Sequence, residues 1–166
     1  MRIRVLRQHY CARCNIVKRS PRSTGVKLLL SVTDVKTKRV LDFGCGNWRN
    51  SQFLEGQGSY VVKIDAIPDT KPDVVAYPTH LPFRQGAFHI ALYTHTLMFL
   101  EDKTHWPKAL EEAARVTREY LVLETYHVKH SQALKYTVDD LLKLLAKWEL
   151  VRRNTRRDMQ NFVIKI

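Results

Sequence analysis

The chain has 166 residues, 45% of them hydrophobic and 27% charged, which is enough to bury the core of one domain and argues against a disordered chain. Six glycines, six prolines and three cysteines exclude collagen-like and disulfide-scaffold architectures, and no apolar run approaches the roughly 20 residues that span a bilayer. The charged start is not followed by the apolar stretch of a secretory signal, and the few cysteines suggest reduced thiols. We expect a soluble, cytoplasmic protein.

The net charge of +12 is concentrated at one end of the chain. Residues 1–39 carry eleven of the 28 lysines and arginines but one of the 16 acids, whereas the rest of the chain carries 17 basic and 15 acidic residues. Such a segment is either a solvated tail that aids solubility or an arm that binds a polyanion, most plausibly nucleic acid. Charge alone leaves both interpretations open.

The predicted elements divide the chain after residue 38, into a basic N-terminal arm with a helix (1–38) and a domain (39–166). A helix is expected through Val26, Leu29 and Leu30, and further helices over about 50–57, from Thr104 and from Thr137, where Asp139 and Asp140 favour the helix start. Apolar, β-branched runs between them predict strands. These runs are residues 40–43, 60–64, 73–76, 89–93, 120–123 and 161–166.

Strands that alternate with helices require crossover connections, which produce a largely parallel sheet covered on both faces. The helix that follows Thr104 accepts Pro107 in its first turn and would bury Trp106, Leu110 and the alanines at 113 and 114. We therefore expect an α/β fold, Rossmann-like and doubly wound, with about seven mostly parallel strands.

The clearest motif is Val40-Leu41-Asp42-Phe43-Gly44-Cys45-Gly46-Asn47, a strand that enters a Gly-x-Gly loop before a helix. Glycines suit a tight turn that a ligand approaches closely. Arg49 stands where a dinucleotide fingerprint has its third glycine, and the Lys-Ser/Thr of a P-loop is missing, which disfavours both alternatives. Asp65 ends the next strand, where a carboxylate reaches the ribose of a bound nucleoside.

Together with later motifs, this arrangement resembles the class I S-adenosylmethionine-dependent methyltransferases. The resemblance is closest to the methyltransferase type 11 subgroup, typified by ubiquinone and menaquinone biosynthesis enzymes and some tRNA wobble-uridine methyltransferases. The matching segments are the glycine loop, Asp65, Leu81-Pro82-Phe83 with Phe88 after it, and Ala113-Ala114-Arg115-Val116.

The resemblance implies that S-adenosylmethionine is the cofactor. Gly44 and Gly46 would lie under its methionine part, Asp42 would order the loop near its ammonium group, and Asp65 would bind its ribose. Tyr77, which replaces the acid usual in the family, would stack on the adenine. The expected cofactor-binding residues are Asp42, Gly44, Cys45, Gly46, Asn47, Asp65, Ala66, Tyr77, Pro78, Tyr93 and Thr94.

Methyl transfer from a sulfonium mainly requires alignment of the acceptor with the methyl group, and a base is needed only for a protonated acceptor. Tyr93 and His95, at the exit of the fourth strand, are the catalytic candidates, and Glu124, Tyr126 and His127 lie at the exit of the fifth. His95 would serve an oxygen or ring-nitrogen acceptor, or is simply hydrogen-bonded within a loop. The missing Asn/Asp-Pro-Pro-Tyr motif disfavours adenine-N6 and glutamine-amide acceptors.

The cysteines do not predict a metal site. Cys11 and Cys14 with His9 offer three zinc ligands, but a structural zinc site normally needs four and no second cysteine pair follows. Free thiols or a labile disulfide are the alternatives. Cys45 is a small filler of the glycine loop.

A second basic patch, Arg152–Arg157, is expected between the last two strands, where it is either a solvated turn or a partner of the arm on a phosphate backbone. The leading interpretation is a methyltransferase that acts on RNA or another anionic macromolecule, bound through residues 1–39 and this patch. The alternatives are a small-molecule methyltransferase and a non-catalytic nucleic-acid-binding module on the same fold.

Overall fold

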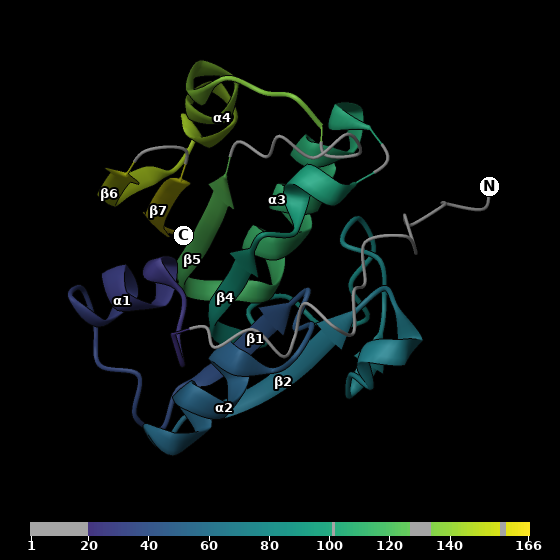
Figure 1. Ribbon diagram of the computed structural model, residues 1–166, viewed down its shortest axis with the longest axis vertical. Coiled ribbons are helices and arrows are strands. Elements are labelled where there is room, and N and C mark those ends of the chain that lie inside the picture. Colours follow the sequence, from purple (N-terminus) through teal and green to yellow (C-terminus); the bar gives the residue numbers. More distant parts are fainter. Residues whose placement is uncertain (1–19, 101, 127–133, 157–158) are drawn as a thin grey trace.

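A computed structural model describes residues 20–100, 102–126, 134–156 and 159–166 (Figure 1). Its centre is a seven-stranded sheet in the order β3-β2-β1-β4-β5-β7-β6. The strands are β1 (Arg39–Phe43), β2 (Tyr60–Asp65), β3 (Val74–Val75), β4 (Phe88–Thr94), β5 (Thr117–Tyr126), β6 (Glu149–Arg156) and β7 (Met159–Lys165). The α-helices are α1 (Thr24–Leu30), α2 (Arg49–Gly56), α3 (Trp106–Val116) and α4 (Val138–Leu145), and the short 3₁₀ turns are η3 (Pro68–Thr70), η4 (Leu97–Phe99) and η5 (Lys103–His105).

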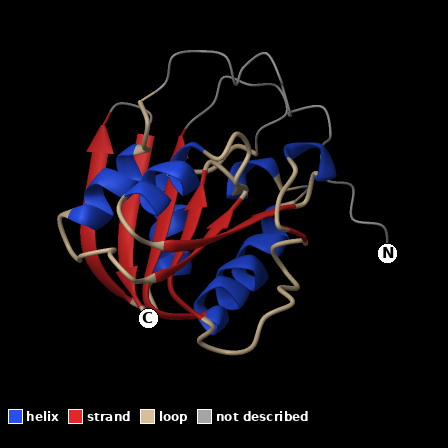
Figure 2. Cartoon of the chain, turned by 90° about the horizontal axis from the view of Figure 1, so that it is seen from below, coloured by secondary structure: helices blue, strands red, loops and turns tan. Residues whose placement is uncertain are grey.

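The sheet is mixed, with its parallel part at the centre. Strands β1 to β5 pair in parallel, so their carboxyl ends lie at one edge, whereas β7 runs antiparallel between β5 and β6. Helices cover both faces, as Figure 2 shows. The expected doubly wound, mostly parallel α/β fold of about seven strands is confirmed.

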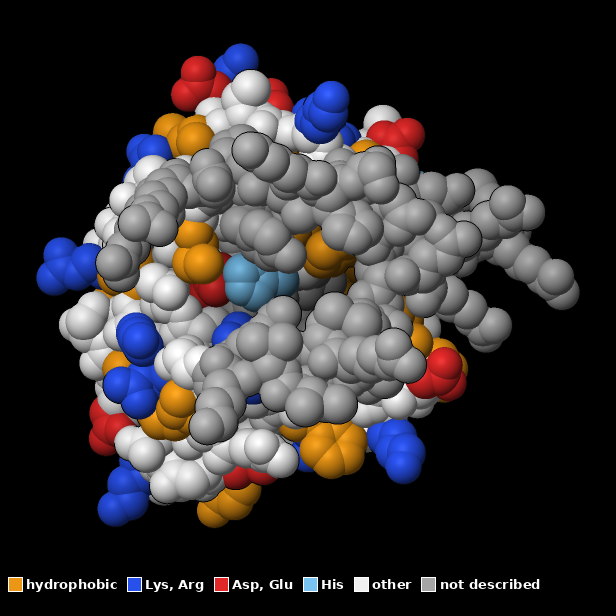
Figure 3. Space-filling model, viewed as in Figure 1, with side chains coloured by type: hydrophobic (Ala, Val, Ile, Leu, Met, Phe, Trp, Pro, Cys, Tyr) orange, Lys and Arg blue, Asp and Glu red, His pale blue; other side chains and the backbone are white. Residues whose placement is uncertain are grey.

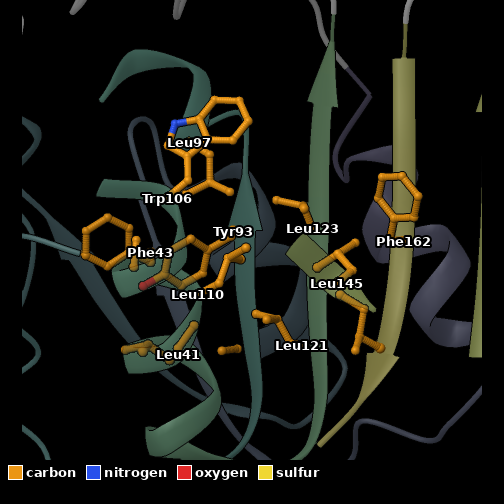
Figure 4. Close-up of a cluster of buried hydrophobic side chains, with 14 of the residues drawn as sticks. Leu41, Phe43, Tyr93, Leu97, Trp106, Leu110, Leu121, Leu123, Leu145 and Phe162 are labelled. Carbon is orange, nitrogen blue, oxygen red and sulfur yellow. The ribbon is translucent and has the colours of Figure 1, made fainter. Parts of the chain in front are cut away.

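Two apolar layers hold the helices to the sheet. On one face, α3 and α4 pack on side chains such as Phe43, Tyr93, Leu121 and Phe162 (Figure 4). On the other, Val26 and Leu29 of α1 and Leu54 of α2 pack with β-strand residues that include Leu92 and Val122. Alternate residues of one strand supply the two layers, because successive side chains point to opposite faces.

Helix α1 belongs to this packing although it lies in the predicted arm. Ser23 caps the helix by accepting a hydrogen bond from Val26, and Val26 and Leu29 are fully buried. Arg22 stacks on the ring of Phe53, with its guanidinium carbon 4.6 Å from the ring centre. Residues from about 22 onward therefore share the core of the sheet, and the division of the chain after residue 38 stays a prediction.

Two local predictions need correction, and one is confirmed. The turn that leads into α3 is capped by Asp102, which accepts a hydrogen bond from the Thr104 amide, so Thr104 is not the cap. The basic residues from 152 to 156 lie within β6 and not in a turn between strands. Thr137 does cap α4, through a reciprocal capping box with Asp140. In the described part of the chain, no helix is both long and apolar enough to cross a bilayer.

Candidate functional site

The glycine loop is anchored to the neighbouring strand at the carboxyl edge of the sheet. The amides of Gly44 and Cys45 both donate to the carbonyl oxygen of Ile64, at 2.8 and 3.1 Å. Gly44 and Gly46 both have positive φ, 73° and 49°, a region that costs most side chains energy. The loop is thus a tight turn between β1 and α2 that requires glycine at two places.

Gly44 is fixed by a neighbour as well as by its backbone. A Cβ atom there would overlap the side chain of Thr96, whose hydroxyl donates to the Phe43 carbonyl at 3.1 Å. Thr96 therefore ties the exit of β4 to the exit of β1 and occupies the space beside Gly44.

Gly46 and Asp65 leave room for a ligand. A Cβ atom on Gly46 would meet only the Gly44 carbonyl oxygen, at 3.9 Å. The Asp65 carboxylate, 8% exposed, accepts hydrogen bonds from the Gly46 amide at 3.2 Å and the Ile67 amide at 3.0 Å. Ala66 and Thr70 add hydrogen bonds to this carboxylate, so an oriented acceptor stands beside an open backbone. This arrangement fits the ribose hydroxyls of a nucleoside cofactor.

Asp42 is a buried carboxylate, 1% exposed, that faces α2. Its Oδ2 accepts a hydrogen bond from the Ser51 hydroxyl at 2.6 Å, while Oδ1 has no hydrogen-bond partner among the described residues. Burial raises the pKa of Asp42 to about 6, and the negative charge of Asp65 adds to this. The ligand-free fold thus holds negative potential under the glycine loop, which suits the cationic end of the predicted cofactor.

The remaining predicted cofactor residues differ in accessibility. Asn47 is exposed, Ala66 is half-buried, and Pro78 is buried. The Tyr77 ring stands edge-on to the ring of His105, with 6.3 Å between ring centres. The buried Cys45 thiol has its pKa raised by burial to about 12, which rules it out as a nucleophile and agrees with its interpretation as a filler.

Tyr93 lies inside the core. Its side chain is 0% exposed and stacks on Phe43 with 5.0 Å between ring centres (Figure 4). Burial raises the pKa of its phenol above the ordinary range. Since the side chain points away from the carboxyl edge into the apolar layer, we do not retain Tyr93 as a catalytic candidate. Thr94, next to it, is buried on the other face and accepts a hydrogen bond from the Asn50 amide group at 3.1 Å.

His95 pairs with Glu124, which sequence reasoning named only as lying at the exit of the fifth strand. The imidazole Nε2 is 2.8 Å from Glu124 Oε1, and the side chains are 23% and 1% exposed. Burial would raise the pKa of Glu124, but hydrogen bonds from His95, Gly25 and Ser23 hold it below its usual value. On the face seen in Figure 3, a histidine side chain lies beside an acidic one.

Arg115 holds a loop that the sequence only marked as a motif. Its guanidinium donates to the carbonyl oxygens of Phe83 and Leu81, at 2.8 and 3.0 Å, and to the carboxylate of Glu112. Glu112 in turn accepts a hydrogen bond from the Leu81 amide, with 3.0 Å between the amide nitrogen and Oε2. The side chain thus connects two of the matched segments and positions the chain between β3 and β4, instead of facing solvent as a polar helix residue.

Several predicted features fall outside the described residues. These are Cys11 and Cys14 with His9, His127, and Arg157. Within the described ranges, no group of three or more histidine, cysteine, aspartate or glutamate side chains is arranged to hold a metal ion. The zinc alternative therefore stays an untested part of the sequence interpretation.

Comparisons with known proteins find that the chain is similar to methyltransferases. Residues 41–120 match a family described as a methyltransferase domain. No curated protein sequence matches the chain. A similar solved structure is an S-adenosylmethionine-dependent methyltransferase from Aquifex aeolicus, with a TM-score of 0.73 at 15% identity, covering 93% of this chain and 95% of that one.

Two further structures share the fold. The PH0226 protein from Pyrococcus horikoshii has a TM-score of 0.73 at 14% identity, and the match covers 85% of this chain and 87% of that one. Magnesium protoporphyrin IX methyltransferase from Synechocystis, solved with bound S-adenosylmethionine, has a TM-score of 0.62 at 14% identity, covering 84% and 74%. At these identities the structural matches establish the fold alone.

Proposed function

We propose that this chain is a class I S-adenosylmethionine-dependent methyltransferase that methylates RNA or another anionic macromolecule, since residues 41–120 match a methyltransferase domain and the chain has the fold of such enzymes. S-adenosylmethionine supplies an activated methyl group on a sulfonium, so the protein's task is to orient donor and acceptor. The observation that supports a polyanionic acceptor is the charge, because residues 1–39 account for ten of the twelve net positive charges.

We assign the donor to the carboxyl edge of β1 and β2. Asp65 would accept hydrogen bonds from the ribose hydroxyls, the open backbone at Gly46 would lie against the methionine part, and Asp42 would provide the negative potential for its cationic groups. Tyr77 would border the adenine from the end of β3. These roles follow from the oriented carboxylate and the open glycine described above.

Basic side chains on an edge strand add a second contact surface. Arg152 and Arg153 are exposed on β6, the last strand of the sheet. The Arg153 guanidinium lies 5.7 Å from the centre of the Phe162 ring and donates to Thr155 at 3.3 Å, which orders an otherwise mobile long side chain. Guanidinium groups held in this way suit phosphate oxygens.

Equilibrium titrations with RNA at several salt concentrations test the proposal. Removal of residues 1–19 takes away six lysines and arginines and no acid, yet keeps the Ser23 cap of α1. A cut after residue 24 would remove that cap. We expect weaker RNA binding and a shallower salt dependence, by about 0.7 to 0.9 in the slope of log K against log salt per lost phosphate contact.

The matched control removes two positive charges from α3 and α4, away from the proposed RNA contacts. Substitution of Arg152 and Arg153 by alanine should weaken RNA binding, whereas Lys108→Ala with Lys143→Ala, exposed on α3 and α4, should not. S-adenosylmethionine affinity, measured by calorimetry, should be unchanged in every variant. Absence of any salt-sensitive RNA affinity in the full chain, with donor binding intact, would favour a small-molecule acceptor; absence of donor binding would favour a non-catalytic module.

A further inference from the structure

His95 is held in an unusual backbone conformation by one partner. Its φ of 57° lies in the left-handed region, which is strained for a residue other than glycine. The His95 amide donates to the Glu124 carbonyl oxygen at 2.7 Å, while the imidazole Nε2 meets the Glu124 carboxylate at 2.8 Å. Main chain and side chain of His95 are therefore both fixed by one residue of β5.

Glu124 is itself fixed from behind. Its second carboxylate oxygen, Oε2, accepts the amide of Gly25 at the start of α1, and the Ser23 side chain adds a hydrogen bond. Glu124 is 1% exposed and pairs with Thr94 on β4 and Asn161 on β7, so two neighbouring strands and a helix enclose it. A buried carboxylate with all its neighbours in place orients a histidine well, because neither oxygen is free to turn.

From this geometry we propose that Glu124 is a positioning residue that makes His95 the general base of the methyl transfer. The carboxylate accepts the Nε2 hydrogen, which leaves the lone pair of the neutral imidazole on Nδ1. Nδ1 is buried in this structure, so proton transfer requires the acceptor to come into contact with it. The inference rests on the proposed function, since it concerns the acceptor of the same reaction.

The step balances as a displacement with proton transfer. The acceptor heteroatom attacks the methyl carbon, the carbon–sulfur bond breaks with its electron pair left on sulfur, and the acceptor's proton passes to Nδ1 of His95. The imidazolium formed is stabilised by Glu124 and later releases the proton to water. The pair therefore favours acceptors that carry a hydrogen on the attacking atom, a hydroxyl or a ring N–H, over groups that are nucleophilic without losing a proton.

A tautomer measurement tests the pair without any acceptor. In Glu124→Gln, the Gly25 amide still requires an oxygen, so the new amide NH₂ faces Nε2 and the ring hydrogen must move to Nδ1. We expect nitrogen-15 NMR of the imidazole at pH 8.5 to show Nε2–H in the wild-type protein and Nδ1–H in the variant. The same tautomer in both proteins would overturn the proposal.

Kinetics with tritiated S-adenosylmethionine and bulk RNA then test the catalytic role. Asparagine is chosen in His95→Asn because it tolerates the positive φ of this position. We expect kcat to fall about 100-fold or more in this variant and in Glu124→Gln. Glu124→Asp should recover part of the loss. The control, Glu119→Gln, changes a glutamate of the same strand that pairs with Lys38 at the opposite edge and should leave kcat unchanged.

The outcomes separate the two proposals. Normal kcat in His95→Asn, with methylated RNA formed, would overturn the base and leave the RNA acceptor standing. No methylated RNA from the wild-type protein, together with donor binding and the expected tautomers, would overturn the RNA acceptor and leave the pair standing. Donor affinity should stay within about 2-fold in all variants, because none of the substituted groups is assigned to the donor.

Discussion

Asp42 is a carboxylate whose ionised form the ligand-free fold disfavours. Its pKa is raised to about 6, so the folded chain binds this proton more tightly than the unfolded chain does. The stabilisation by the protonated form is complete below about pH 4 and is lost as the pH rises through about 6.

We therefore expect Asp42→Asn to raise the free energy of unfolding at pH 7.5, by up to about 3 kcal/mol, and to have no such effect at pH 4. Urea unfolding at the two pH values measures this, with the exposed Asp69→Asn as the control for loss of a charge at the same edge. The variant should also bind S-adenosylmethionine more weakly. A gain in unfolding free energy from Asp42→Asn that is as large at pH 4 as at pH 7.5 would contradict the assignment.

Gly44 offers a second test at the residue scale. Gly44→Ala combines a side chain at φ 73° with an overlap on Thr96, and we expect a loss of about 2 to 4 kcal/mol in unfolding free energy. Thr96→Ala removes the overlap but not the backbone cost, so the double variant should lose less than the sum of the single losses. If the losses of unfolding free energy in the two single variants sum to the loss in the double variant, the Thr96 side chain does not overlap with a side chain at position 44.

Among the elements, α3 is linked to the chain before β4 by Arg115 and Glu112. The Arg115 hydrogen bond holds the pKa of Glu112 down at about 2, so this pair stabilises the fold above about pH 4.5 and the contribution is lost as the pH falls toward 2. Arg115→Ala also leaves the carbonyl oxygens of Leu81 and Phe83 without their donor.

We expect Arg115→Ala to cost about 2 kcal/mol at pH 7, and the difference from the wild-type protein to narrow at pH 2.5. Arg115→Lys should not restore stability, because a single ammonium cannot reach both carbonyl oxygens and the carboxylate. Urea unfolding gives the comparison, and Lys143→Ala, exposed on α4, serves as control. A constant difference across this pH range would show that the ion pair is not the cause.

The junction of α1 with β5 gives a prediction about two elements. A Cβ atom on Gly25 would lie 2.8 Å from Glu124 Oε2 and 3.0 Å from Val122 Cγ1. Gly25→Ala should therefore destabilise the fold by about 1 to 3 kcal/mol and lower kcat by moving the carboxylate behind His95. Gly56→Ala, where a Cβ atom meets nothing within 4 Å, should instead be neutral or slightly stabilising.

Unfolding curves and the methylation assay together decide this case. If Gly25→Ala lowers the unfolding free energy but leaves kcat unchanged, the packing of α1 against β5 does not influence His95.

At the scale of the whole molecule, local patterns were sufficient to predict the architecture. Apolar runs bounded by glycine or proline predicted the parallel strands, and Thr137 with Asp140 predicted the start of α4, because these signals are contained in a few neighbouring residues. The cap predicted before α3 was wrong, because Asp102 caps the preceding 3₁₀ turn and the N-cap position of α3 itself falls on His105.

The site was predictable only in part, for a physical reason. The glycine loop and Asp65 could be recognised from the spacing of their residues in the sequence. Thr96 against Gly44, and Glu124 against His95, are contacts between side chains of different elements that no periodicity encodes. Tyr93 shows the converse: one residue of register decides whether a side chain at a strand end faces the site or the core.

The antiparallel β7 has a practical consequence. It starts opposite Tyr126, at the carboxyl edge of β5, and ends opposite Tyr120, and the Ile166 amide donates to the Glu119 carbonyl oxygen beyond it. Ile166 therefore lies at the edge of the sheet away from the glycine loop. An affinity tag, dye or surface tether joined after Ile166 would leave the carboxyl edge unobstructed, so donor binding can be measured on immobilised protein without the attachment itself competing for the site.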